Sequence, residues 1–250
     1  MSAPILRPLS LGEVLDVSFG LYRSRFAPLL VVSVVCQLLP SLLRVYYGSG
    51  SLFQNPPLLL VYYTLAIVLS AVGVAASTFI VSDAYLGRET SASAALGQAV
   101  SKIGRIVLVS MVSSLLIGIG FILLIVPGFV LLSGLILSTV VTVLEMPENS
   151  TQAMGRSWEL TKGFRGKVLL TMICVGLMFM VPTITVSVIW GILGASTGRV
   201  MVVGTEVLTS LLTILINPFF YVVLTVLYYD LRVRKEGFDL ELLATQMAPV

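Results

Sequence analysis

Histidine is absent from this 250-residue chain, and charged residues make up only 11% of it. The lack of histidine removes the commonest general base, the His-dependent catalytic triads and the usual ligand of zinc and haem iron. The two cysteines, Cys36 and Cys174, fall inside apolar stretches, where a thiol behaves as a small hydrophobic group and does not indicate a redox compartment. No basic surface suited to nucleic acid is expected outside the segments that flank the apolar stretches.

Apolar residues dominate what remains, at 57% of the chain with a mean hydropathy of +1.04. This composition predicts an all-α polytopic membrane protein. The uncharged run 106–144 would form a helix about twice as long as the ~30 Å hydrocarbon core of a bilayer, so it must fold back, and Pro127-Gly128 is the expected turn. Six spans result, at about 26–43, 58–82, 106–126, 129–144, 168–191 and 207–229.

Three short amphipathic segments precede the three pairs of spans, at about 10–25, 91–103 and 149–162. Ser10 with Glu13 reads as a capping box, Asn149 with Gln152 as a second cap, and Gly163 as a helix stop. We expect one integral membrane domain over 1–250, built from three repeat units at about 9–88, 89–146 and 147–230. A tail at 231–250 ends in a short amphipathic helix.

Positive charges indicate the orientation of the chain. Thirteen of the fifteen Lys and Arg residues fall in the N-terminal segment, the connections after spans 2 and 4, and the tail, which all lie on one side of the six-span arrangement. The bias predicts a multi-pass protein of the cell (inner or plasma) membrane with both termini in the cytoplasm.

The amphipathic segments have two interpretations. They lie in the headgroup layer, with basic side chains on anionic lipid, or they form a docking surface for a protein partner or a second copy of this chain. Aromatic rings favour the interface in both cases. The candidate contact residues are Phe19, Tyr22, Arg156, Trp158, Lys162, Phe238, Leu240 and Leu243.

Prolines in spans 5 and 6 mark a candidate gap at mid-membrane depth. Pro182 and Pro218 each lack an amide N–H and leave a carbonyl unbonded one turn earlier, that of Ile214 or Leu215 in span 6. Asn217 adds an amide at the same level, and binding sites of repeat-built membrane proteins tend to lie at such broken helices. The alternative is a pair of simple kinks, with the carbonyls satisfied by threonine and asparagine side chains of the same helices.

Four stretches resemble a bacterial family, the glycerophosphoryl diester phosphodiesterase membrane-domain proteins. They are RPLSLGEVLDVSFGLYRSRFAPLL near the start, IVPGF at the expected turn, AMGRSWELTKGFRGKVL, and the most specific, YYDLRVRKEGFDLELL. The resemblance implies a six-span bundle that some members fuse to a soluble phosphodiesterase domain. That domain is expected to be absent here, because no connection between spans is long enough to hold it and nothing follows Val250. The resemblance supplies no catalytic residues.

Enzymatic activity is not expected. Phosphodiester hydrolysis needs metal-binding carboxylates or an acid–base pair gathered around the reacting atoms, whereas the twelve carboxylates here are spread thinly over the connections. No catalytic, metal or cofactor site is predicted. The leading hypothesis is a non-enzymatic scaffold or assembly subunit that presents its cytoplasmic helices to a partner or to anionic lipid. The alternatives are a small transporter or lipid-handling protein with a cavity between the repeats, and the membrane half of a separately encoded phosphodiesterase.

Overall fold

The computed structural model describes residues 7–85, 87–194 and 199–237, and its elements within these ranges are all α-helices. Six of the described helical stretches are long and apolar enough to cross a membrane, which confirms the expected all-α polytopic class. They are α2 (Phe26–Tyr47), α4 (Pro56–Tyr85), α6 (Ile103–Leu123), α7 (Ile125–Leu135) continued by α8 (Ser138–Leu144), α10 (Arg165–Gly194) and α11 (Arg199–Glu236).

Short helices precede each pair of long ones, as the sequence predicts. They are α1 (Leu11–Ser24), α5 (Ala92–Ser101) and α9 (Ser150–Thr161), while α3 (Ser49–Gln54) joins α2 to α4. The Ser10 hydroxyl accepts the Glu13 N–H at 3.3 Å, and the Glu13 carboxylate accepts the Ser10 N–H at 2.7 Å, which completes the expected capping box. Gly163 has a φ of 89°, a left-handed conformation that suits glycine after a helix end.

The turn between α6 and α7 lies at Leu124 and not at Pro127-Gly128 as predicted. Pro127 falls in the first turn of α7, where its missing N–H has no intrahelical partner to lose. Gly128 packs instead against the facing helix, because a Cβ there would lie 2.4 Å from the Phe121 ring. The glycine therefore allows the two helices to approach closely, while the reversal itself takes place four residues earlier.

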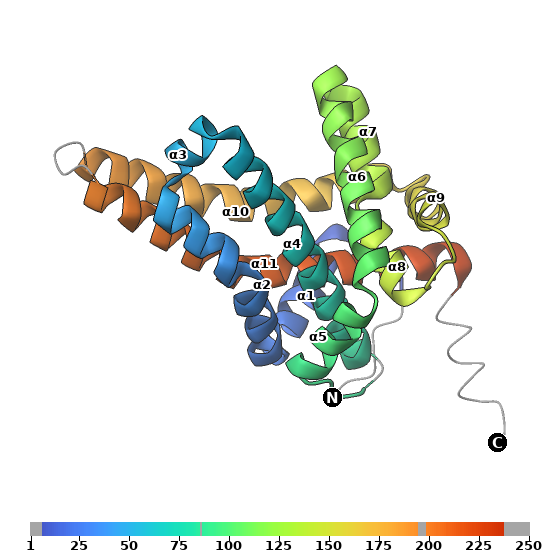
Figure 1. The fold of residues 1–250 in the computed structure, drawn as a ribbon. Helices are drawn as coiled ribbons and strands as arrows, with labels where there is room; N and C mark the ends of the chain where they lie inside the picture. The colour runs from blue at the N-terminus through green and yellow to red at the C-terminus, as the bar shows by residue number, and fades with distance from the viewer. Residues whose placement is uncertain (1–6, 86, 195–198, 238–250) are drawn as a thin grey trace.

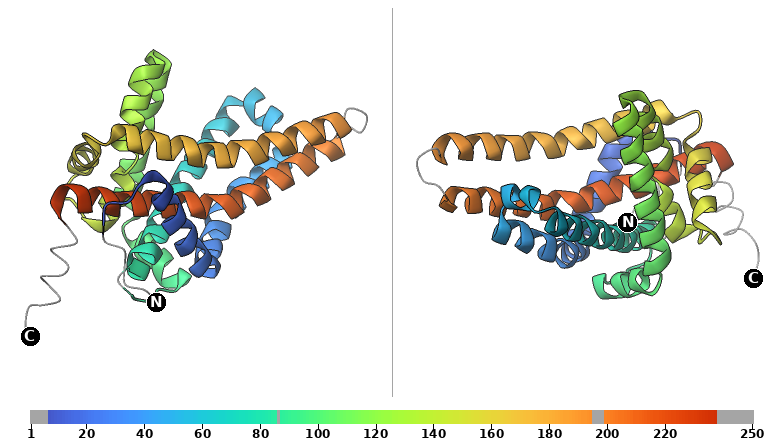
Figure 2. Two further views of the ribbon diagram at one scale, coloured as in Figure 1. Left: turned by 180° about the vertical axis from the view of Figure 1, so that it is seen from behind. Right: turned by 45° about the horizontal axis from the view of Figure 1, so that its top comes forward.

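The three hairpins meet at one end of the molecule and separate at the other (Figure 1). Helices α1, α5, α8, α9 and the C-terminal part of α11 gather at the end that we call the base. Helices α10 and α11 run side by side away from it, α2 packs along α11, and the α6–α7 hairpin points in another direction in every view (Figure 2). Its tip is exposed, with Ile122 84% accessible.

The hydrophobic core is concentrated towards the base. The C-terminal half of α11 is buried almost continuously, with Tyr228, Leu227 and Leu231 each fully covered. By contrast, the apolar part of α10 has most of its side chains exposed. Apolar exposure of this kind is expected for helices that face lipid, because lipid tails are as apolar as the side chains themselves.

Candidate functional site: a polar cavity above an ion-paired base

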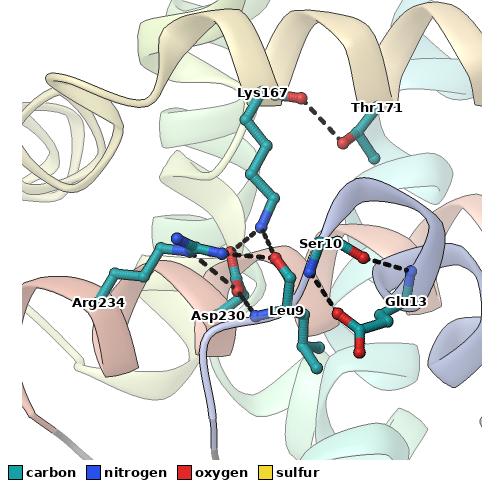
Figure 3. A network of polar contacts seen from close by, with 7 residues as sticks. All are labelled: Leu9, Ser10, Glu13, Lys167, Thr171, Asp230 and Arg234. Atoms are coloured by element: carbon teal, nitrogen blue, oxygen red, sulfur yellow. Dashed lines mark hydrogen bonds and ion pairs between the residues drawn. The ribbon is translucent and has the colours of Figure 1, made fainter.

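A buried carboxylate links the two ends of the chain at the base (Figure 3). The Asp230 side chain of α11 is fully buried and accepts the Leu9 N–H at 2.7 Å. Lys167 of α10 forms an ion pair with it, and Arg234 donates to its two oxygens at 3.1 and 3.2 Å. Lys167 and Arg234 also donate to the Leu9 carbonyl. A buried charge is tolerated only when it is paired and hydrogen-bonded. We therefore interpret this group as structural, because it holds the N-terminal segment, α10 and α11 together.

A second ion-paired group joins the end of α8 to α9 and α11. Arg156 of α9 donates to Glu145 at 2.8 Å and pairs with Glu236, while the Tyr228 hydroxyl donates to the other Glu145 oxygen at 2.8 Å. Burial by itself would lower the pKa of Arg156, but the hydrogen bonds that its guanidinium donates to the two carboxylates outweigh burial and raise the pKa. Arg156 thus stays charged and serves the internal packing of the base.

Most of the predicted contact residues that the structure describes are also used internally. Trp158 packs against Gly134, where a Cβ would lie 2.1 Å from its ring, and the Arg165 guanidinium stacks on it at 3.9 Å. Phe19 is 57% accessible and Lys162 is exposed. The remaining three candidates, Phe238, Leu240 and Leu243, lie outside the described residues, as does the predicted C-terminal helix.

The carbonyls near Pro218 are satisfied from other helices. The Ser33 hydroxyl of α2 donates to the Ile214 carbonyl at 2.7 Å, and the Tyr22 hydroxyl of α1 donates to the Leu215 carbonyl at 2.8 Å. These partners differ from the expected side chains of the same helix. They tie this part of α11 to α1 and α2, and they show that the predicted contact residue Tyr22 is used internally.

A gap at Pro182, Asn217 and Pro218 remains a prediction. None of the three residues lines the cavity described below. Near Pro182, the Thr183 and Thr185 hydroxyls donate to carbonyls of their own helix, including that of Val181 at 2.7 Å. Such bonds are common for threonine in apolar helices and need no cavity beside them.

One cavity lies where α4 and α6 come together above the base, and it has a volume of about 390 Å³. Ala66, Ile67 and Val74 of α4 form one wall, and Phe220 and Leu224 of α11 form the floor. In Figure 1, α4 and α6 approach each other beside α8 and then diverge. Polar side chains on four helices contribute to the lining: Gln37, Ser70, Ser110, Ser113, Ser114 and Thr139.

These polar groups lie near the middle of the membrane-spanning stretches. Ser113 is ten residues into α6, and Gln37 is eleven residues into α2, which places both about 15 Å along helices that cross a hydrocarbon layer of ~30 Å. Phe220 and Leu224 are one turn apart on α11, whereas Pro218 points about 200° away from Phe220 around the helix. Pro218 is therefore on another face of α11, whereas Asn217, seven residues before Leu224, is on the same face as the cavity residues but does not line the cavity.

Three of the lining hydroxyls are paired, and the buried hydroxyl of Ser113 is not. The Ser110 and Thr139 hydroxyls lie 2.9 Å apart, and the Ser70 hydroxyl lies 3.4 Å from that of Tyr221. Ser113 is 94% buried, since 6% of it is accessible, and its Oγ has no hydrogen-bond partner among the described residues. A buried hydroxyl without a partner costs about 1–3 kcal/mol, so Ser113 lowers the stability of this part of the bundle.

Sequence reasoning did not single out this cluster, although part of it was visible. Ser110, Ser113 and Ser114 are spaced i, i+3 and i+4 inside an otherwise apolar span, which puts three hydroxyls on one face of a helix. The partners on α2, α4 and α8 are far away in sequence, and no local pattern indicates that they meet α6.

An ion pair joins α2 to α11 near the C-terminal end of α2. Arg44 donates to Glu206 at 2.7 and 3.0 Å and to the Thr209 hydroxyl at 3.0 Å. Glu206 is only 5% accessible, whereas its position at the start of span 6 predicts contact with water. A charge of this kind is stabilised by its partner, and the pair ties the two helices together at the end opposite the base.

Among the described residues, no group of three or more Asp, Glu or Cys side chains is arranged to hold a metal ion. Comparison of the chain with family models, with curated proteins and with solved structures gives no match.

Proposed function

We propose that this protein is a non-enzymatic membrane protein that takes up a lipid or a lipid-like solute in the cavity between its repeats, as a lipid-handling protein or a small transporter. The observation that carries the proposal is the cavity of about 390 Å³ within the membrane-spanning part of the bundle, whose mostly apolar lining includes a few polar side chains. Small-molecule sites are concave, mostly apolar and supplied with a few convergent polar groups. The volume of this cavity falls within the usual range of such sites.

The scaffold alternative has less support from the packing. Of its candidate contact residues, Arg156 is held by two carboxylates and Trp158 is packed between Gly134 and Arg165. Binding a partner through these side chains would require breaking the base. The alternative now depends on the exposed Phe19 and Lys162 and on residues 238–250. The only support for the third hypothesis, that the protein is the membrane half of a separately encoded phosphodiesterase, is the family resemblance.

Filling the cavity tests the proposal. Ala66→Trp places a large ring on the cavity wall, whereas Thr64→Trp places the same ring on an exposed position about 200° away on the same helix. Native mass spectrometry of protein purified in a mild detergent should find one bound small molecule on the wild type and on Thr64→Trp, and none on Ala66→Trp. Absence of a bound molecule from the wild type, or equal retention by both variants, would overturn the proposal.

We further propose the cell membrane as its location, with both termini in the cytoplasm and the base on the cytoplasmic side. The support is the distribution of Lys and Arg, most of which lie in segments that meet at the base or beside it. Reporter fusions after Gly50, Val126 and Thr197 should give the signal of the outer compartment. A cytoplasmic signal from any one of them would contradict this orientation.

A further inference from the structure

We infer that a second pocket, at the base, binds a phosphate group through Lys102 and Arg105. This basic pocket has a volume of about 410 Å³, and its lining residues are Ser101, Lys102, Gly104, Arg105, Thr142 and Met146. None of them lines the cavity between α4 and α6, so the inference concerns a separate site and does not depend on the proposed function.

The basic pocket lies at the edge of the membrane. Lys102 immediately precedes α6, and Met146 follows the end of α8 by two residues, so the pocket forms where one span begins and the next one ends. The 21 residues of α6 give a length of about 32 Å, close to the ~30 Å of the hydrocarbon core, which places the start of α6 at the level of the lipid headgroups. Ser101, Gly104, Arg105 and Met146 are exposed, so the pocket opens at the surface.

The two cations of the basic pocket have no carboxylate partner among the described residues. The Lys102 ammonium donates to the Met146 sulfur at 3.3 Å and lies 5.3 Å from the centroid of the Phe79 ring. Arg105 donates one N–H to the Pro147 carbonyl at 3.0 Å and keeps further N–H groups for a ligand. These neutral partners orient the two side chains but do not neutralise their charge.

Other basic side chains at the base serve internal ion pairs. Arg156, Lys167 and Arg234 each bind a carboxylate. Glu145, which is next to the pocket in sequence, is one of these carboxylates, and Glu148 does not line the pocket. Because no lining residue is acidic, the positive charge of the basic pocket favours a negatively charged ligand.

The types and spacing of the two cations suit a phosphate. Lys102 and Arg105 are three residues apart at the start of α6, which puts them on one face. The guanidinium fork matches two phosphate oxygens, and the ammonium adds a compact charge. The Ser101 and Thr142 hydroxyls donate to carbonyls of their own helices, so the two cations are the main donors. A phosphate monoester carries about 1.5 to 2 negative charges at pH 7, which two cations can balance.

The phosphate has two possible sources, a lipid headgroup and a solute in the adjoining water. The level of the pocket favours the headgroup, because basic pockets between membrane helices on the cytoplasmic side are places where anionic headgroups bind. Both sources offer the same chemical group to Lys102 and Arg105, and competition between them distinguishes the two.

Removing both cations tests the contact. Lys102→Gln combined with Arg105→Gln should weaken phosphate binding about tenfold or more, because charge-assisted hydrogen bonds are lost. Arg23→Gln combined with Lys162→Gln is the matched control, since it removes the same charge from two exposed residues that do not line the basic pocket. The control should bind as the wild type does.

Gly104 allows a second test that keeps both cations. A Cβ at this position meets nothing within 4 Å, and an acidic residue is favourable in the first turn of a helix, so Gly104→Asp is compatible with the fold. The new carboxylate would compete with the phosphate for the cations. Gly104→Asp should therefore bind about threefold or more weakly than Gly104→Asn, which has the same size and no charge.

The experiment measures binding of radiolabelled dioctanoyl phosphatidic acid to the protein in phosphatidylcholine nanodiscs, with empty nanodiscs subtracted. Nanodiscs are used because detergent exchanges with a lipid held at so open a site. The competitors are unlabelled dioctanoyl phosphatidic acid, inorganic phosphate, and dioctanoylglycerol, which has the same chains without the phosphate. We expect saturable binding at one molecule per chain, no competition by dioctanoylglycerol, and unchanged binding by Ala66→Trp, because the cavity is a separate site.

The outcomes are distinct from those of the cavity test. Competition by the unlabelled lipid alone assigns the site to a headgroup, and equal competition by inorganic phosphate assigns it to a dissolved phosphate; both support the inference. Absence of saturable binding, equal competition by dioctanoylglycerol, loss of binding in Ala66→Trp, or equal affinities of the pocket variant and its control would overturn it. None of these results changes what native mass spectrometry of Ala66→Trp says about the cavity.

Discussion

Replacing Asp230 by asparagine should destabilise the protein by about 2–4 kcal/mol. The change keeps the size of the side chain and removes its charge, so Lys167 and Arg234 remain at the base with no carboxylate between them. Their side chains are only 14% and 24% accessible, and water can therefore compensate for only part of the loss. The amide also has a single oxygen acceptor for three donor residues, one of which is the Leu9 N–H at 2.7 Å. Breaking a fully buried pair costs about 3–5 kcal/mol, and the partial exposure of the two cations lowers the expected value.

The free energy of unfolding in mixed micelles, obtained from titration with a denaturing detergent, measures this effect. Glu89→Gln is the control, because it breaks the Arg25 ion pair at a carboxylate that is 85% accessible and should change the free energy by no more than about 1 kcal/mol. Lys167→Met alone and combined with Asp230→Asn completes a double-mutant cycle. A loss below about 0.5 kcal/mol for Asp230→Asn, or additive effects of the two changes, would refute the reasoning.

Two further substitutions test the packing by the same unfolding measurement. Gly134→Ala should destabilise the protein by about 1–3 kcal/mol or more, because the new Cβ would lie 2.1 Å from the Trp158 ring. In Gly155→Ala the new Cβ meets nothing within 4 Å, so this change should stabilise its helix by about 0.5–1 kcal/mol. Equal effects of the two changes would contradict the close approach of Trp158 to Gly134. Ser33→Ala removes the 2.7 Å bond to the Ile214 carbonyl and should cost about 1–3 kcal/mol, and an unchanged stability would show that this carbonyl has another partner.

The overall architecture could be predicted because it depends on length and local pattern. Spans follow from uncharged runs of membrane length, and helix starts follow from caps such as Ser10 with Glu13, which act over three residues. The turn between α6 and α7 was predicted less well. Proline is tolerated in the first turn of a helix, so Pro127 permits a reversal at Leu124 as readily as at its own position.

The role of polar residues was harder to predict, because it depends on partners that are far away in sequence. Arg156 is on the polar side of α9 and was expected to contact lipid or a partner, yet Glu145 and Glu236 hold it in the base. The same limit applies to the cavity. The spacing of Ser110, Ser113 and Ser114 is visible in the sequence, but only the fold brings these serines into one lining with Ser70 and Gln37.

A cryo-electron microscopy map of the protein in lipid nanodiscs tests the central claim most directly. The account predicts an elongated non-protein density in the cavity, extending between α4 and α6 towards the lipid. A cavity closed by its own side chains, or one that contains only separate water-sized features, would contradict it.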